Sequence, residues 1–179
     1  MMKKLVFSGF GGQGILTLGQ IVATIAMNQG SHVTWMPSYG VEMRGGTANC
    51  SVIISDRIIG SPIIQSGIDV LTALNGPSID KFLPRVKSGG LVLVNSSIVK
   101  NPISRDDVKV VSIDATNIAV ELGNLKVANM VMIAGFLKET DLFTLEDVKQ
   151  VLEETFREKN PNLIPLNLTA IERGLQDIG

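Results

Sequence analysis

The most constraining feature of this chain is a glycine-rich stretch, GFGGQG at residues 9–14, which lies between an apolar segment and a helical pattern. Residues 3–8 have the length and apolar content of a short buried strand. After the glycines, and before Gly30 ends the pattern, apolar residues recur at helical spacing as Ile15, Leu18, Val22 and Ile25. A strand, a tight turn and a helix in this order are typical of an α/β fold.

The alternation of strands and helices continues beyond this unit. Short apolar or alternating segments predict further strands at residues 33–36, 47–54, 70–74, 91–94 and 108–113. Between them, residues 77–86 predict a short helix with proline at its start, and Asp114 is expected to cap a helix that ends at Gly123. The pattern therefore predicts an open, mainly parallel sheet with flanking helices.

From about Lys126 onward the chain is expected to be helical. Residues 127–137 are apolar almost all round, with Asn129 as the one strongly polar side chain, so this helix should be buried and Asn129 hydrogen-bonded. Thr144 is expected to cap the next helix, with Asp147 in its first turn, and NPNLIP at residues 160–165 to connect it to a final short helix. Residues 1–179 are expected to form a single domain.

Composition excludes several classes of protein. Sixteen basic and seventeen acidic residues nearly cancel, so no net field attracts nucleic acid or an anionic membrane. A single cysteine cannot form an internal disulfide or ligate a zinc ion or iron–sulfur cluster by itself, and no metal site is expected. The first apolar run breaks at Ser8, too early for a signal peptide, and no apolar stretch is long enough to span a membrane, so a cytoplasmic location is expected.

The glycine stretch supports two interpretations. Gly9, Gly11 and Gly14 satisfy G-x-G-x-x-G, and free N–H groups from Gly11 to Gly14 at a helix start would attract a phosphate. The dinucleotide fingerprint also requires an acidic residue about 20 positions further on. The second predicted strand ends in TWMPS, without an acid. The stretch is therefore either an anion site or an ordinary tight turn.

A second glycine-bearing segment, SYGVEMRGGTANC at residues 38–50, carries the first charges after Lys4. Arg44 suits a phosphate or carboxylate ligand, with Glu42 holding the guanidinium in place. Alternatively, Glu42 and Arg44 form an ion pair that closes the loop. Both interpretations stay open on residue chemistry alone.

Charge is distributed unevenly along the chain. Only two charged residues precede position 42, whereas fourteen lie from Lys138 onward. The first predicted helix presents an uncharged polar face opposite its apolar stripe: Thr17, Gln20, Thr24 and Asn28. Such a face is either a subunit contact or an exposed surface that lacks charge, and we favour the subunit contact because charged residues are depleted at interfaces.

Other polar residues have ordinary structural explanations. Cys50 falls on the apolar side of a predicted strand and is expected to be a core residue, and His32 is expected to be structural. Asn75, Asn95 and Asp114 each follow a strand, so they either cap helices, the interpretation we favour, or line a ligand crevice.

The pairing of GFGGQGI with SYGVEMRGGTANC resembles the gamma subunit of 2-oxoacid:ferredoxin oxidoreductases, and the resemblance continues through GSPII, LTALN and VANMVMIAG. The family usually has proline where this chain has Val41, which leaves Glu42 and Arg44 in place. The sequence looks most like the 2-oxoglutarate type, although pyruvate, branched-chain and indolepyruvate relatives share these motifs.

The resemblance implies one subunit of a larger enzyme. The complex would use thiamine diphosphate, Mg²⁺, iron–sulfur clusters and coenzyme A to convert a 2-oxoacid to an acyl-CoA and CO₂, with electrons passed to ferredoxin. The gamma subunit would hold none of these cofactors alone and would assemble with alpha, beta and delta subunits. In isolation it would be inactive, with a homodimer as one form it could take. It would help to form the coenzyme A side of the active site, with no catalytic residue, through Gly9, Gly11, Gly12, Gln13, Gly14, Glu42 and Arg44.

Two other functions remain open at this point. One is a stand-alone nucleotide- or dinucleotide-binding protein of Rossmann-like fold, and the other is a pure scaffold subunit without any ligand contact.

Overall fold

The computed structural model describes residues 1–40, 45–158 and 160–178. Its centre is a six-stranded sheet in the order β2-β3-β1-β4-β5-β6. β3 runs antiparallel to both of its neighbours, and the other five strands share one direction, which confirms a mainly parallel α/β fold. The strands are β1 (Met2–Phe10), β2 (His32–Tyr39), β3 (Thr47–Ser55), β4 (Ile68–Ala73), β5 (Val86–Asn95) and β6 (Lys109–Ile113).

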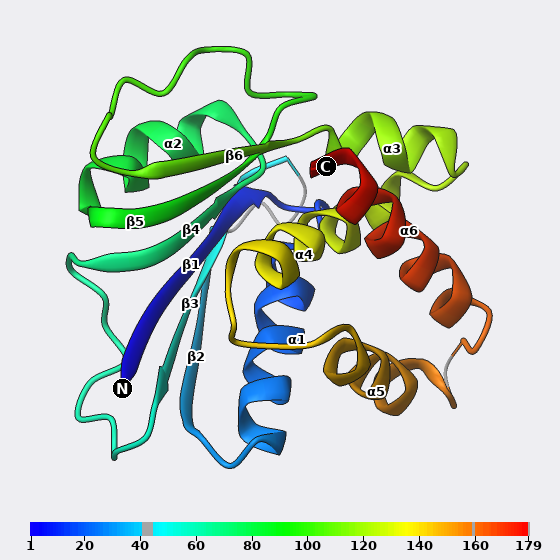
Figure 1. Ribbon diagram of the computed structural model, residues 1–179, viewed down its shortest axis with the longest axis horizontal. Coiled ribbons are helices and arrows are strands. Elements are labelled where there is room, and N and C mark those ends of the chain that lie inside the picture. Colours follow the sequence, from blue (N-terminus) through cyan, green and yellow to red (C-terminus); the bar gives the residue numbers. More distant parts are fainter. Residues whose placement is uncertain (41–44, 159, 179) are drawn as a thin grey trace.

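Helices flank this sheet on both faces. Figure 1 shows α1, α4, α5 and α6 gathered on one side of the sheet, with α2 on the other. The helices are α1 (Ile15–Asn28), α2 (Gly76–Phe82), α3 (Ala115–Glu121), α4 (Ala128–Glu139), α5 (Leu145–Phe156) and α6 (Leu163–Ile178), with short 3₁₀ turns η1 (Leu83–Arg85) and η2 (Leu125–Val127). None of the helices in the described ranges has the length and hydropathy needed to span a membrane.

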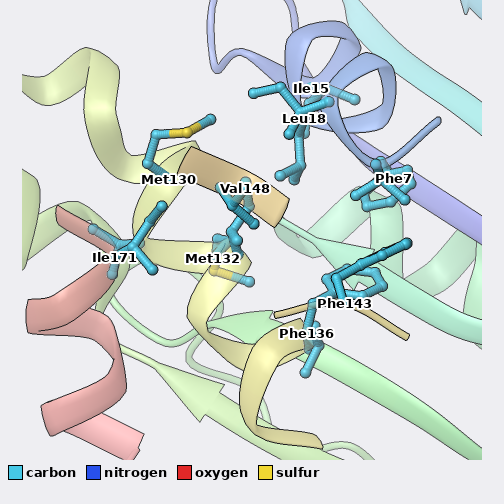
Figure 2. Close-up of a cluster of buried hydrophobic side chains, with 14 of the residues drawn as sticks. Phe7, Ile15, Leu18, Met130, Met132, Phe136, Phe143, Val148 and Ile171 are labelled. Atoms are coloured by element: carbon cyan, nitrogen blue, oxygen red, sulfur yellow. The ribbon is translucent and has the colours of Figure 1, made fainter. Parts of the chain in front are cut away.

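Side-chain alternation along the strands divides the core in two. Leu5 and Phe7 of β1 point into the larger cluster with α1 and α4, whereas Val6 between them points into the smaller cluster under α2. In the larger cluster, Phe7 stacks on Phe136 of α4 with ring centroids 5.4 Å apart (Figure 2). The buried character predicted for the helix at residues 127–137 is confirmed, since all of its side chains from Ala128 to Phe136 are buried.

Two of the predicted helix boundaries were wrong, and a proline lies near each. The predicted helix at residues 77–86 ends at Phe82, because Pro84 cannot donate the next helical hydrogen bond, and η1 leads into β5. The final helix is not short: α6 has 16 residues and begins within the predicted connector. Pro165 is tolerated there because it occupies the first turn, where the backbone N–H has no helical acceptor.

Two of the predicted helix caps form as expected. The Thr144–Asp147 capping box forms at the start of α5, and Asn75 Oδ1 accepts from Ser78 N at 2.9 Å at the start of α2. Asp114 precedes α3, but its side chain accepts no backbone N–H there. Ser97 Oγ instead accepts from the N–H groups of Thr116 and Asn117, at 3.0 and 3.1 Å, and Asp114 accepts from the Ser97 hydroxyl at 2.6 Å.

Candidate functional site

The glycine turn that joins β1 to α1 is closed by Gln13. Its side-chain Oε1 accepts from Phe10 N at 2.7 Å, while its backbone N–H donates to Phe10 O at 3.1 Å. Gly12 and Gly14 adopt left-handed φ angles of 98° and 73°, which glycine alone adopts without strain. Asn129 of α4 donates from Nδ2 to the carbonyl oxygen of Gly14 at 3.2 Å, so its expected hydrogen bond is confirmed.

The expectation that all N–H groups from Gly11 to Gly14 face a ligand needs correction. Gly11 N–H donates to Gly46 O at 2.8 Å, and Gln13 N–H is used inside the turn. Within the described ranges, the N–H groups of Gly12 and Gly14 have no hydrogen-bond partner. An anion at the turn would therefore meet these two groups and the start of α1.

The second glycine-bearing segment is hydrogen-bonded to the glycine turn through Gly45 and Gly46. Gly45 N–H donates to Gly11 O at 3.3 Å, reciprocating the bond from Gly11 to Gly46. Glu42 and Arg44 themselves lie outside the described residues. At the start of this segment, Tyr39 lines a hollow of about 300 Å³ together with Gly12, Gly14 and Thr17. The two sequence motifs therefore meet at one place in the fold.

A second hollow of about 300 Å³ lies on the other side of the turn, at the carboxyl ends of three parallel strands. Gln13 follows β1, Leu74 follows β4, and Asn95 ends β5, and all three line it. The helices after β1 and β4 pack on opposite faces of the sheet, so this is a topological switch point, where open α/β sheets bind ligands. Asn95 is fully buried there and donates to Thr116 Oγ1 at 2.8 Å. Of the three strand-end residues, Asn75 caps α2, and Asn95 both lines this hollow and accepts from Thr116 N of α3 at 3.4 Å. The Asp114 side chain accepts no backbone N–H of α3.

Lys126 is a candidate site residue that the sequence reasoning missed. It lines both the second hollow and a third of about 250 Å³, and Gly12 lines the same two. Its side chain is exposed, and no acidic residue of the described ranges forms a salt bridge with it. Its backbone is held by Asn124, whose Oδ1 accepts from Lys126 N at 3.1 Å. The sequence did contain a signal for this site residue, because Lys126 is the only charged residue between Glu121 and Lys138.

This arrangement suits binding of an anionic ligand better than acid–base or nucleophilic chemistry. Lys126 and Gly12 line both the second and the third hollow, and Gly14 lines the third, so a lysine and backbone N–H groups at the start of α1 border mostly apolar hollows. Cys50 is confirmed as a core residue: it is fully buried, and burial raises the pKa of its thiol to about 12, which makes it a poor nucleophile. Among the residues that the structure describes, no group of three or more His, Cys, Asp or Glu side chains could hold a metal ion.

Comparison with known proteins identifies the family. The family model described as pyruvate ferredoxin/flavodoxin oxidoreductase matches residues 4–177, almost the entire chain. The chain belongs to the pyruvate ferredoxin/flavodoxin oxidoreductase family. The resemblance read from the glycine turn and the SYGVEMRGG segment is therefore confirmed.

Members of the oxidoreductase family with different substrates in their names are similar to this chain. It is 37% identical over 175 residues to the ketoisovalerate oxidoreductase subunit VorA of Methanothermobacter thermautotrophicus, covering 97% of this chain and 36% of that protein. It is 34% identical over 155 residues to the 2-oxoglutarate synthase subunit KorC of Methanocaldococcus jannaschii, covering 85% of this chain and 82% of that one. The chain thus spans about a third of the VorA relatives and most of KorC.

Solved oxidoreductase structures share the fold. The gamma subunit of a keto/oxoacid ferredoxin oxidoreductase from Geobacter sulfurreducens superimposes with a TM-score of 0.80 at 28% identity, over 98% of both chains. The 2-oxoglutarate:ferredoxin oxidoreductase of Magnetococcus marinus, solved with 2-oxoglutarate, coenzyme A and succinyl-CoA bound, gives a TM-score of 0.88 at 22% identity. That match covers 99% of this chain and 31% of the Magnetococcus chain.

Proposed function

We propose that this chain is the gamma-type subunit of a 2-oxoacid:ferredoxin oxidoreductase. The complex would convert a 2-oxoacid and coenzyme A to an acyl-CoA and CO₂, with the electrons taken up by ferredoxin. The observation that carries the proposal is the family match over residues 4–177, joined to the full-length superposition on the Geobacter gamma subunit. Identities to the ketoisovalerate and 2-oxoglutarate relatives are similar, so the proposal names the class of 2-oxoacids, with 2-oxoglutarate as the first substrate to test.

Within such a complex, the hollows around the glycine turn are proposed to face coenzyme A. Coenzyme A carries phosphate groups, which suit the N–H groups of Gly12 and Gly14 and the Lys126 ammonium. Arg44 is proposed as a second anion-binding side chain, with Glu42 to orient it, and Gly9, Gly11 and Gln13 as the residues that shape the turn. The coenzyme A bound to the Magnetococcus enzyme makes this ligand the natural first choice.

Thiamine diphosphate, Mg²⁺ and iron–sulfur clusters are assigned to the other subunits in this proposal. The residues of this chain do not fit an iron–sulfur cluster or Mg²⁺, because its one cysteine is buried with a pKa of about 12 and the described residues contain no suitable cluster of ligands. No step is therefore assigned to these groups on this chain. Its own contribution is to bind and orient an anionic substrate at the carboxyl ends of β1, β4 and β5.

A stand-alone nucleotide-binding protein is the alternative function. It is favoured by the glycine turn at a switch point, and disfavoured by the end of β2, where Ser38 and Tyr39 stand in place of the acid that would hold a ribose. Calorimetric titration of the isolated chain with NAD, NADP and coenzyme A separates the two. Tight binding of a dinucleotide would support the alternative.

Anaerobic purification of a tagged copy from its native cell tests the proposed function. We expect larger chains bearing thiamine diphosphate and iron–sulfur clusters to co-purify, and the preparation to reduce ferredoxin when a 2-oxoacid and coenzyme A are both present. Assays with 2-oxoglutarate, pyruvate and 2-oxoisovalerate then identify the substrate. Recovery of the chain without partners under mild conditions would count against the proposal.

A further inference from the structure

The third hollow, of about 250 Å³, is built from parts of the chain that lie far apart in sequence. Its walls come from the start of α1, from η2 and α4, from the end of α5 and from the start of α6. The helices α1, α4, α5 and α6 lie on the same side of the sheet (Figure 1). Pockets for drug-sized ligands occupy about 300–1,000 Å³, so this hollow suits one group of a larger ligand.

A buried amide of α6 borders this hollow without a hydrogen-bond partner. Asn167 is only 6% exposed, lines the hollow, and makes no side-chain hydrogen bond to another residue of the described ranges. It is not among the described polar groups that are sealed from solvent without a partner, which are Thr34, Thr72 and Asn75. The polar atoms of Asn167 are therefore open to the hollow. Because a buried amide without a partner costs free energy, a ligand group that pairs with it is favoured.

Asn129 of α4 presents a second amide to the same hollow, and its orientation is fixed. Its Nδ2 donates to Gly14 O at 3.2 Å, which leaves Oδ1 as the atom that can accept a hydrogen bond from a ligand. Asn129 is also only 6% exposed. A carboxamide oxygen accepts hydrogen bonds and cannot donate them. The hollow thus offers an acceptor from Asn129, and both a donor and an acceptor from Asn167.

Apolar side chains supply much of the remaining wall. Met130 of α4, Phe156 of α5 and Leu163 of α6 all line the hollow. Proteins bind a nucleobase between aromatic or apolar side chains and read its edge by hydrogen bonds, and asparagine pairs with the N6 amino group and N7 of adenine. The adenine amino group donates, which matches Asn129 Oδ1. Its N7 accepts, which matches Asn167 Nδ2.

Groups that suit a phosphate line the same hollow. Gly12 and Gly14 contribute to its wall, and their N–H groups have no hydrogen-bond partner in the described ranges. Of the described residues that line the hollow, Lys126 alone is charged. An ammonium group and free N–H groups at a helix start are typical phosphate ligands. Amides for a base and donors for a phosphate therefore share one hollow, which suits a ligand that joins the two.

We propose that the third hollow binds the adenine base of a phosphorylated adenosine ligand, and that Asn167 and Asn129 recognise the base. This inference rests on the proposed function, in which the ligand is coenzyme A, because coenzyme A carries an adenine base joined to phosphates. A free adenine nucleotide has the same chemistry, and the experiments below separate it from coenzyme A. The end of α5 and the start of α6 then become part of the ligand site.

Exchange of adenine for hypoxanthine tests the base without altering the protein. Hypoxanthine has a carbonyl oxygen where adenine has its amino group, so two acceptors would face each other at Asn129. In the purified complex, the KM for the hypoxanthine analogue of coenzyme A should exceed the KM for coenzyme A by a factor on the order of 10 to 100, with kcat little changed. Equal KM values for the two compounds would count against coenzyme A as the source of the base.

Asn167→Ala tests the protein side, and Gln176→Ala is the matched control, because it removes an exposed amide from the same helix. Calorimetry of the complex gives the Kd for adenosine diphosphate and for inosine diphosphate. We expect Asn167→Ala to weaken binding of adenosine diphosphate about tenfold and to reduce the preference for adenine, because one hydrogen bond to the base is lost. The control should bind as the wild type does. A variant with an unchanged thermal unfolding midpoint and wild-type affinity for adenosine diphosphate would overturn the proposal.

Competition identifies the source of the base. Adenosine diphosphate that raises the KM for coenzyme A without lowering kcat supports coenzyme A as the source. Adenosine diphosphate that binds more tightly than inosine diphosphate, yet leaves the KM for coenzyme A unchanged, supports a free adenine nucleotide in the hollow. Absence of an adenine preference in both the kinetic and the calorimetric measurement would overturn the proposal. A chain recovered without partners would instead refute the proposed function, and titration of that chain with the two diphosphates would still decide whether the hollow binds adenine.

Discussion

Asn129 of α4 and Gly14 at the start of α1 approach so closely that a Cβ on Gly14 would lie 2.4 Å from Asn129 Nδ2. The amide donates to the Gly14 carbonyl oxygen, so one buried side chain links the glycine turn to α4. Gly14 is therefore required twice, by its left-handed φ and by this contact. The glycine motif therefore serves packing, in addition to the ligand contact that we propose for it.

Gly14→Ala is expected to destabilise the chain by about 2–4 kcal/mol, which combines left-handed strain with overpacking. Gly12→Ala is the matched control, because Gly12 has a positive φ but no atom within 4 Å of its added Cβ. It should cost only about 1–2 kcal/mol. Urea denaturation measures both. Combining Gly14→Ala with Asn129→Ala should cost less than the sum of the two single changes, and strict additivity would contradict the contact.

The buried thiol of Cys50 predicts a pH effect on stability. Burial raises its pKa from 9.0 to about 12, so above pH 9.0 the unfolded chain loses a proton that the folded chain retains. The free energy of unfolding should therefore fall as pH rises beyond that point, with a slope of at most about 1.4 kcal/mol per pH unit from this group. Denaturation of the wild type and of Cys50→Ala should show a shallower slope in the variant. Equal slopes would mean that the thiol ionises as readily in the folded chain.

The same burial predicts chemical inertness. A thiol reagent should modify native Cys50 more slowly than the unfolded chain by a factor on the order of 1,000 or more, because reaction needs both exposure and the thiolate. The measurement compares modification rates with and without denaturant. Rapid native labelling would contradict the packing of Cys50 beneath Gly19, where an added Cβ would lie 2.3 Å from the sulfur.

The capping box of α5 predicts an effect at acid pH. Hydrogen bonds from the Thr144 hydroxyl and backbone hold the pKa of Asp147 below its usual range. A depressed carboxyl pKa contributes stability that is present above the unfolded value of 3.8 and is lost as pH falls through the folded value. Thr144→Ala should therefore cost about 1 kcal/mol near neutral pH and less in acid. Thr155→Ala, further along the same helix, is the control, and an equal cost at both pH values would count against the box.

The proposed role of Lys126 leads to a prediction about the KM for coenzyme A. In the purified complex, Lys126→Gln should raise the KM for coenzyme A by about tenfold, with kcat little changed, because an interaction with a remote phosphate stabilises ground and transition states alike. Lys149→Gln, on the outward side of α5, is the charge-matched control. An unchanged KM for both coenzyme A and the 2-oxoacid would favour a scaffold subunit without ligand contact.

Local patterns in the sequence were enough to predict much of the fold. Periodicity located the strands and helices because burial imposes a repeat of two or about 3.6 residues on any single segment. The cap at Asn75 and the Thr144–Asp147 capping box could also be predicted from local sequence, because capping joins residues only three positions apart. The glycine turn followed from backbone sterics. Each of these inferences needs only neighbours along the chain.

What only the tertiary structure decided depends on partners far apart in sequence. Three features each require two distant segments to meet: the reversed direction of β3, the cap that Ser97 supplies to α3, and the hollow that Lys126 and Gly12 both line. The hydrogen bond from Asn28 of α1 to Glu154 of α5 likewise joins two distant segments. Sequence alone thus determined the elements, the turn and the family resemblance. Long-range packing decided which polar groups are left to meet a ligand or a partner, because a hydrogen-bonding group is available only if no distant residue has already satisfied it.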